Sequence, residues 1–426
     1  MQYRISRIGE ALSGHSGIVE LMDDLGAAMA GGAAGMHMLG GGNPAHVPAM
    51  QAVWRQRLRE IAADAPYCDR LLANYDGPAG SPSFRAAMAD CLRTEFGWPV
   101  GPENIAITCG GQTAFFFLFT LLAGEMAAGP RRRILLPLMP EYIGYADQGL
   151  APGTFVSQRP RIELQGDRQF KYRIDFDALR VGDDVGAICV SRPTNPTGNV
   201  LTDEEIDRLA ALAREREIPL LVDNAYGEPF PAAVFEPIQP VWRPGMVMTF
   251  SLSKLGLPGT RTAIVLGDPP LIQRIRAMTG VVGLANNNMG QAIVEPLLAE
   301  GKLIQLCRNE IRPFYQAKSQ AALQVLAEEF GDDFPWRVHR SEGAFFLWLW
   351  LPELPISTQE LYVRLKERGV LVVPGEYFFY GLGENDSDDW AHRRQCVRLT
   401  FSQSTETVEA GIAAIAEELR RVHRGK

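Results

Sequence analysis

Short apolar runs rich in β-branched residues alternate with helix-like stretches between residues 104 and 267. Runs that are apolar throughout, rather than alternately apolar and polar, are typical of strands covered on both faces. The helix-like stretches between them, of which Gln112–Leu122 and Asp203–Arg216 are the clearest, would supply those covers. We therefore predict an α/β fold with a mostly parallel central sheet and helices on both faces. The predicted strands are Asn104–Thr108, Ile134–Leu138, Ala187–Ser191, Pro219–Asp223, Val247–Ser251 and Thr262–Leu266.

The pattern changes after about Pro269, where helical periodicity dominates and includes one long helix from Leu303 onward. The elements that follow indicate a smaller α/β unit. They are a strand at Ala344–Trp350, a helix at Ser357–Arg368, strands at Val370–Val373 and Val397–Phe401, and a helix at Glu406–His423. We predict an N-terminal arm and linker over residues 1–47, a large domain over 48–309 and a small C-terminal domain over 310–426. The arm contains the glycine-rich segment Gly31–Gly42.

Composition excludes several classes of protein. Hydrophobic residues make up 46% of the 426-residue chain and charged residues 22%, which is enough apolar material for a large core. The 42 basic and 50 acidic residues leave a net charge of −8, which disfavours sequence-independent binding of nucleic acid. No stretch of 18 residues is apolar without charge, and no signal-like segment stands near the start, so we expect a cytoplasmic protein that does not bind membranes. The six cysteines form no CxxC pair and the six histidines show no metal-ligand spacing, so we expect reduced thiols and no metal.

The segment Ser251–Arg261 carries the strongest chemical signal. It places Lys254 just after an apolar strand and two serines, Ser251 and Ser253, and before glycines and an arginine. A lysine that attacks a carbonyl group needs a fixed, partly desolvated site, and hydroxyls with an arginine can bind a phosphate. A lone lysine in such a loop would more simply be exposed to solvent. Three further segments favour the chemical interpretation.

Each of these segments follows a predicted strand. Asp223 stands where open α/β sheets bind ligands, and its carboxylate could hold a pyridine nitrogen protonated. Asn195 lies between two prolines, and its amide could bind a ring hydroxyl. The glycines of Thr108–Ala114 allow backbone N–H groups at a helix start to approach a phosphate. Taken singly, these features also fit a helix cap, a rigid proline turn and an ordinary strand-to-helix turn.

The combined pattern resembles the fold-type I, pyridoxal-5′-phosphate-dependent aminotransferases of class I and II over essentially the whole chain. Five strings more narrowly resemble the valine–pyruvate aminotransferase family: His15–Ile18, Leu39–Ala45, Asn74–Pro78, Pro140–Asp147 and Ser251–Arg261. The resemblance implies a mostly parallel sheet in a large domain and a smaller C-terminal α/β domain. It also implies transfer of the α-amino group of a neutral, valine-like amino acid to a 2-oxo acid such as pyruvate, by a ping-pong mechanism.

The resemblance assigns roles to individual residues. Lys254 would hold pyridoxal phosphate (PLP) as a Schiff base and move a proton, Asp223 would pair with the ring nitrogen, and Tyr142 would stack on the ring. The other implied cofactor contacts are Gly111, Gln112, Asn195, Tyr226, Ser251, Ser253 and Arg261. Tyr75 would reach the cofactor of a neighbouring subunit, which implies a homodimer with shared sites. Arg398, Gly42 and Asn195 would bind the substrate.

Some positions depart from the family's pattern: Gly111, Glu376, Asn286–Asn288 and Leu399–Ser402. They leave a second function open, a PLP-dependent β- or γ-elimination or replacement, with a sulfonium amino acid such as S-adenosylmethionine as a candidate substrate. A transcriptional regulator built on this fold would need a basic helix-turn-helix domain of about 60–70 residues. The arm Met1–Gly42 is too short, glycine-rich and not basic, which argues against that function.

Overall fold

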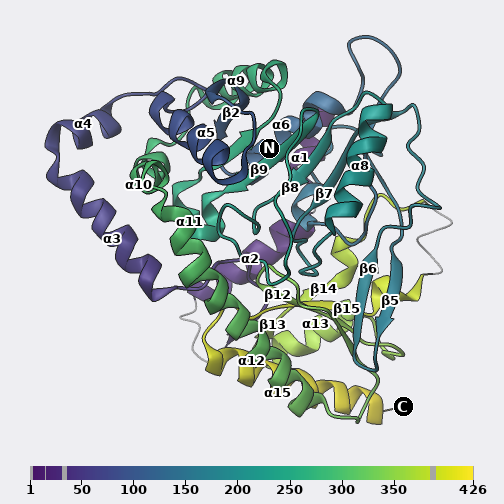
Figure 1. The fold of residues 1–426 in the computed structure, drawn as a ribbon. Helices are drawn as coiled ribbons and strands as arrows, with labels where there is room; N and C mark the ends of the chain where they lie inside the picture. The colour runs from purple at the N-terminus through teal and green to yellow at the C-terminus, as the bar shows by residue number, and fades with distance from the viewer. Residues whose placement is uncertain (1–2, 15, 31–35, 384–389, 426) are drawn as a thin grey trace.

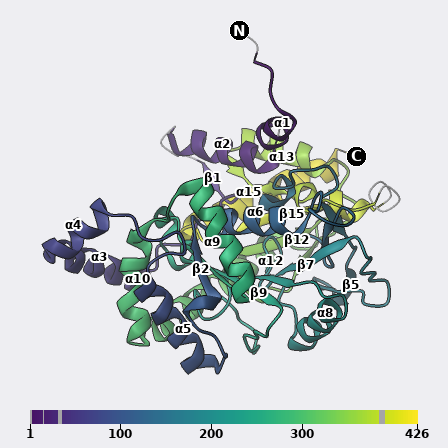
Figure 2. The ribbon, with the colours of Figure 1, turned by 90° about the horizontal axis from the view of Figure 1, so that it is seen from above.

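The computed structural model describes residues 3–14, 16–30, 36–383 and 390–425 (Figures 1 and 2). A seven-stranded sheet, with the order β2-β10-β9-β8-β7-β3-β4, forms its centre. Strand β10 runs antiparallel to β2 and β9, and the other neighbouring pairs are parallel. Its strands are β2 (Ile105–Thr108), β3 (Arg133–Leu136), β4 (Phe155–Ser157), β7 (Val185–Ser191), β8 (Leu220–Asp223), β9 (Met246–Ser251) and β10 (Ala263–Leu266). The predicted mostly parallel sheet is thus confirmed, and β4 is an additional strand.

Helices cover this sheet because the chain crosses it in two directions. The crossover from β2 to β3 contains α6 (Gly111–Leu122), and the crossover from β7 to β8 contains α8 (Asp203–Glu215). Right-handed crossovers that run in opposite directions place their helices on opposite faces, as Figure 2 shows. Helix α8 begins where a capping box forms, because Thr202 and Glu205 exchange side-chain and backbone hydrogen bonds of 2.9 and 3.2 Å. Helices α5 (Pro82–Phe96), α9 (Pro269–Gly283) and α10 (Asn288–Ala299) complete this part.

A second, six-stranded sheet has the order β14-β15-β12-β11-β6-β5. Its strands are β5 (Arg161–Gln165), β6 (Gln169–Arg173), β11 (Arg337–His339), β12 (Phe346–Trp350), β14 (Val373–Pro374) and β15 (Cys396–Thr400). The sequence did not predict the β5–β6 hairpin, whose strand β6 pairs in parallel with β11 some 170 positions later. The helices beside this sheet are α12 (Arg312–Phe330), α13 (Thr358–Glu367) and α15 (Thr405–Arg424).

The predicted long helix from Leu303 is present but changes its winding. Helix α11 (Lys302–Leu306) passes through a π-helical turn, η4 (Cys307–Ile311), into α12. Such π turns are often found at functional sites, although no residue of this one lines either of the two cavities that hold the candidate active site described below. The strand predicted at Val370–Val373 is divided between β13 (Val370–Leu371) and β14.

The N-terminal part lies against the C-terminal part. Helices α1 (Arg7–Ser13) and α2 (Gly17–Ala30) precede β1 (His37–Met38), which pairs in parallel with β13. Helices α3 (Pro48–Ala63) and α4 (Ala65–Ala73) then project to one side (Figure 1). His15 and residues 31–35 of the expected glycine-rich linker lie outside the described residues. The domain boundaries at 47/48 and 309/310 stay predictions. Among the described residues, no helix is both long and apolar enough to span a membrane.

Candidate active site

A cavity of about 210 Å³ opens where β7, β8 and β9 end and α6 begins. The carboxyl ends of parallel strands are where open α/β sheets bind ligands. Ten of the predicted cofactor residues line it, namely Gly111, Gln112, Tyr142, Asn195, Asp223, Tyr226, Ser251, Ser253, Lys254 and Arg261. A larger cavity of about 720 Å³ adjoins it and is lined by Gly42, Tyr142, Asn195, Lys254 and Arg398 among others. Tyr75 lies outside both cavities and is 81% exposed.

Lys254 lies in a 3₁₀ turn, η2 (Leu252–Leu255), that directly follows β9. Its Nζ donates a hydrogen bond of 2.8 Å to the carbonyl oxygen of Gly42, and it stands 5.5 Å from the ring centre of Tyr226. Burial lowers the pKa of Lys254 to about 8, and the nearby Arg398 lowers it in the same direction. The free amine is therefore available close to neutral pH, as a nucleophilic lysine requires.

Asp223 is the last residue of β8 and is held by three donors. The hydroxyl of Tyr145, in α7 (Ile143–Ala146), donates to its Oδ2, while Ala225 N and Thr249 Oγ1 donate to Oδ1 over 3.0 and 3.3 Å. Burial raises the pKa of Asp223 even though these donors lower it. A cation placed in the cavity would restore the preference for the charged carboxylate.

Sequence reasoning did not single out Tyr145 or Thr249. Two signals were available for Thr249: it stands two residues before Ser251, on the same face of β9, and a parallel sheet can place it beside Asp223. Tyr145 follows Tyr142 by one helical turn. Its contact with Asp223 joins residues 78 positions apart in the chain, which no local pattern predicts.

An anion-binding arrangement occupies one end of the cavity. Gly110 and Gly111 begin α6, whose N-terminal N–H groups favour negative charge. Arg261 Nη1 lies 3.4 Å from Ser253 Oγ, and Ser251 Oγ accepts from Ser253 N over 3.1 Å. Gly110 has a φ of +84°, and a Cβ there would come within 2.2 Å of the Arg261 guanidinium, so only glycine fits. These groups suit a phosphate.

Arg398 enters the larger cavity from β15 and is 2% exposed. Its Nη1 donates to Asn195 Oδ1 over 2.8 Å and its Nη2 donates to Gly40 O over 2.7 Å. The guanidinium carbon lies 4.4 Å from the ring centre of Phe346, and burial lowers the pKa of Arg398 to about 10. A guanidinium held in this way is suited to bind a carboxylate through two hydrogen bonds.

Two buried polar atoms test whether a PLP-like group fits. In the described part of the chain, the Tyr226 hydroxyl and the Arg398 Nε have no hydrogen-bond partner. A buried donor without a partner costs about 1–3 kcal/mol, so both positions favour a ligand that accepts hydrogen bonds. Tyr226 lies in the cavity with Asn195 and Asp223, which together would bind a ring bearing a hydroxyl group and a basic nitrogen. The residues present therefore fit the group.

The positions that depart from the family's pattern lie mostly outside both cavities. Glu376, in η5 (Gly375–Phe378), accepts a hydrogen bond of 3.3 Å from Thr358, and it lines neither cavity. The side chains of Asn286 and Asn288 donate to backbone carbonyls of the Asn74–Pro78 segment over 3.1 and 3.2 Å. Their role is to hold that segment rather than to shape a pocket. Ser402, in contrast, lines the larger cavity and donates to Asn43 O over 2.8 Å.

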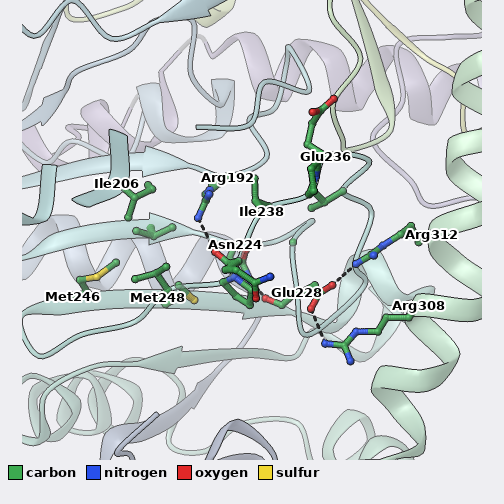
Figure 3. A pocket seen from close by; sticks show the side chains of 17 residues that line it. Arg192, Ile206, Asn224, Glu228, Glu236, Ile238, Met246, Met248, Arg308 and Arg312 are labelled. Atoms are coloured by element: carbon green, nitrogen blue, oxygen red, sulfur yellow. Dashed lines mark hydrogen bonds and ion pairs between the residues drawn. The ribbon is translucent and has the colours of Figure 1, made fainter. Parts of the chain in front are cut away.

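A further cavity of about 270 Å³ lies beside β8 and β9 and is lined by Val222, Asn224, Met246 and Met248 (Figure 3). Along the chain these residues alternate with Asp223 and Thr249, which line the smaller active-site cavity. Neighbouring residues of a strand point to opposite faces, so the two cavities lie on opposite faces of the sheet. Glu228 in this cavity pairs with Arg308 and with Arg312. The Glu228 carboxylate and these two guanidinium groups are thus engaged with one another.

Comparisons with known proteins agree with this geometry. Residues 39–415 match the family Aminotransferase class I and II. The chain is 45% identical over 416 residues to the valine–pyruvate aminotransferase of Escherichia coli strain K12, covering 98% of each. A putative amino-acid aminotransferase from Psychrobacter arcticum 273-4 superposes with a TM-score of 0.95 at 41% identity over both whole chains. The valine–pyruvate aminotransferase of Salmonella typhimurium LT2 has a TM-score of 0.87 and 44% identity, over 96% of this chain and 100% of that one.

Proposed function

Because this chain belongs to the class I and II aminotransferases, we propose that it transfers the α-amino group of a neutral, valine-like amino acid to a 2-oxo acid such as pyruvate. It is a PLP-dependent transferase. The observation that carries the proposal is that Lys254 and Arg398 line one cavity together. No comparison supports elimination or replacement chemistry, and Glu376 and Asn286–Asn288, which suggested it, lie away from that cavity.

The walls of the larger cavity support a substrate with an aliphatic side chain. Arg398 offers a site for the α-carboxylate. Apolar side chains make up part of the lining of the same cavity and come from Ile18, Leu21, Met22, Met38, Ile143 and Phe314. No aspartate or glutamate is among the described residues that line this cavity. Lys318, a further cation in the lining, lies 5.8 Å from the ring centre of Phe314.

In this mechanism each residue has a chemical task that its position permits. Bound PLP supplies an electron sink that makes the Cα–H bond of an amino acid acidic. Lys254 would hold the cofactor and then, as a free amine, accept the Cα proton, which its lowered pKa allows. Asp223 would keep the ring nitrogen protonated, with Tyr145 and Thr249 fixing the carboxylate. Tyr142 would stack on the ring. The remaining contacts would be Asn195 and Tyr226 to the ring hydroxyl, and Ser251, Ser253, Arg261 and the Gly111–Gln112 backbone to the phosphate.

One experiment separates amino transfer from elimination. Incubated with valine and no acceptor, the purified protein should convert its cofactor to the amine form, release one equivalent of 2-oxo acid and stop. Addition of pyruvate should restart the reaction and yield alanine, because the stored amino group then has an acceptor. The measurement is the cofactor absorbance together with mass analysis of products. Continuous product formation without an acceptor, from a substrate with a leaving group at Cβ or Cγ, would contradict the proposal.

We further propose a cytoplasmic homodimer whose two sites are shared. Tyr75 projects from the segment that Asn286 and Asn288 hold, and its ring has little contact within its own protomer. Exposed apolar side chains on α4 and at the end of α9 (Leu72, Val281, Val282 and Leu284) suit an interface. The six cysteines are free, in keeping with a reducing compartment.

Subunit mixing tests the shared site. Tyr75→Phe and Lys254→Ala proteins should each be impaired, but a mixed dimer would contain one complete site, with Lys254 from one protomer and Tyr75 from its partner. Random exchange makes half of the dimers mixed, so about a quarter of wild-type activity should return. The measurement is turnover after exchange, with unmixed variants as controls. Absence of recovery from dimers that have demonstrably exchanged would indicate self-contained sites.

A further inference from the structure

Glu141 is a buried carboxylate that the mechanism above does not use. It stands between β3 and α7, directly before Tyr142, and is 2% exposed. Three groups donate to it: Tyr142 N and Ser191 Oγ to its Oε1, over 2.8 and 2.6 Å, and Ser191 N to its Oε2, over 3.0 Å. All three donors are neutral. Accepting three hydrogen bonds suits an ionised carboxylate, which has only acceptor sites.

No cation balances this carboxylate in the part of the chain that the structure describes. Other buried glutamates have one: Glu342 pairs with Lys171, and Glu418 pairs with Arg368. Burial raises the pKa of Glu141 to about 8, and the charge of Asp223 acts in the same direction, so Glu141 is ionised near neutral pH only when a cation in the cavity lowers its pKa again. The titratable groups that face Glu141 from the surrounding elements are Asp223 (β8), Tyr142 and Tyr145 (α7 and the residue before it), Cys189 (β7) and Tyr380 (after η5). None of them carries a positive charge.

An unpaired buried carboxylate is costly, and such groups concentrate at functional sites. Glu141 is connected to the cofactor cavity in two ways. Ser191, which donates to it twice, ends β7 and is the register partner of Asp223 on β8. Tyr142, whose N–H it accepts, lines the cavity, and Tyr145 one turn later donates to Asp223. Glu141 therefore fixes the position of cavity-lining groups, and with a cation in the cavity to keep it ionised it adds a second negative charge near Asp223.

We propose that Glu141 is a positioning residue of the cofactor site, acting through Ser191 and Asp223. This inference rests on the proposed PLP site. Two nearby carboxylates call for a cation in the cavity, and the protonated ring nitrogen of PLP has that charge. The negative charge of Glu141 consequently strengthens cofactor binding and favours the protonated form of the Lys254-bound cofactor.

Glu141→Gln tests the charge with little change of shape. Apoprotein is titrated with PLP to obtain its Kd, and the visible absorbance of the Lys254-bound cofactor is followed against pH. We expect Kd to rise about tenfold and the midpoint of the absorbance change to fall by about one pH unit, since one unit corresponds to a tenfold change in equilibrium. The matched control is Glu418→Gln, a buried glutamate on α15 that is remote from both cavities, and it should change neither quantity.

Each other outcome also decides the matter. A wild-type protein without the visible absorbance of lysine-bound PLP would contradict the proposed function itself. Bound PLP with an unshifted midpoint in Glu141→Gln would overturn the charge effect, even if Kd changed. If Glu141→Gln does not fold, Glu141→Thr is the second neutral variant. If Glu141→Asp folds but neither neutral variant does, then the residue is needed for stability, and the proposal is overturned.

Discussion

Replacing Lys254 with alanine should lower turnover of valine and pyruvate by at least about ten-thousandfold, because covalent attachment and proton transfer are both lost. The side chain is partly buried and lies beside Gly42 and Tyr226 in the cavity, and no other lysine lines the smaller cavity among the described residues. Borohydride reduction of the wild-type protein followed by peptide mapping should place the pyridoxyl label on Lys254. Lys302→Ala, at an exposed lysine paired with Glu300, serves as the control and should retain activity. A label on another lysine would refute the assignment.

The lowered pKa of Lys254 gives this prediction a pH dependence. Only the neutral amine attacks an aldehyde, and the fraction of neutral amine rises as pH increases through about 8. Recombination of apoprotein with PLP should therefore accelerate from pH 6 to about 9 and then level off. A lysine with an ordinary pKa of about 10.4 would continue to gain speed up to pH 10. Stopped-flow absorbance at a fixed PLP concentration distinguishes the two profiles.

Asp223→Asn should reduce turnover roughly a thousandfold while the protein still binds PLP. The amide keeps the shape of the side chain, and its oxygen can still accept from Tyr145 or Thr249, so the fold should persist. The loss arises because a neutral amide no longer holds the ring nitrogen protonated, which weakens the electron sink. Single-turnover kinetics with valine measure the effect, and a PLP titration verifies occupancy. Asp332→Asn, at an exposed aspartate beside Arg168, is the control, and near-normal turnover of Asp223→Asn would refute the role.

The sequence predicted six of the seven strands of the central sheet, all except β4, because each of those six is a local apolar run. Strands β7, β8 and β9 agree with the predicted Ala187–Ser191, Pro219–Asp223 and Val247–Ser251 to within two residues at each end. The β5–β6 hairpin escaped prediction for the opposite reason. Its residues are only partly apolar, and its partner strand β11 lies about 170 positions later, so its place in the second sheet is decided by long-range pairing.

The same division holds within the candidate site. Lys254, Asp223 and Asn195 could be named from the sequence because each stands at or just after the end of a strand, and a parallel sheet brings the ends of its strands together whatever the intervening chain does. Those residues carry their own local signal. What they do chemically stays a prediction that the experiments above test.

Only the tertiary structure decided which groups surround them. Tyr145 and Thr249 hold Asp223, and Glu141 lies buried against Ser191 with no cation nearby among the described residues, because separate elements pack against one another there. The pKa values follow from that packing: burial lowers the pKa of Lys254 and raises those of Asp223 and Glu141. The sequence by itself thus determined the strands and the reactive side chains, which depend on neighbours in the chain. Their electrostatic environment depends on desolvation by residues distant in sequence, which only the folded arrangement determines.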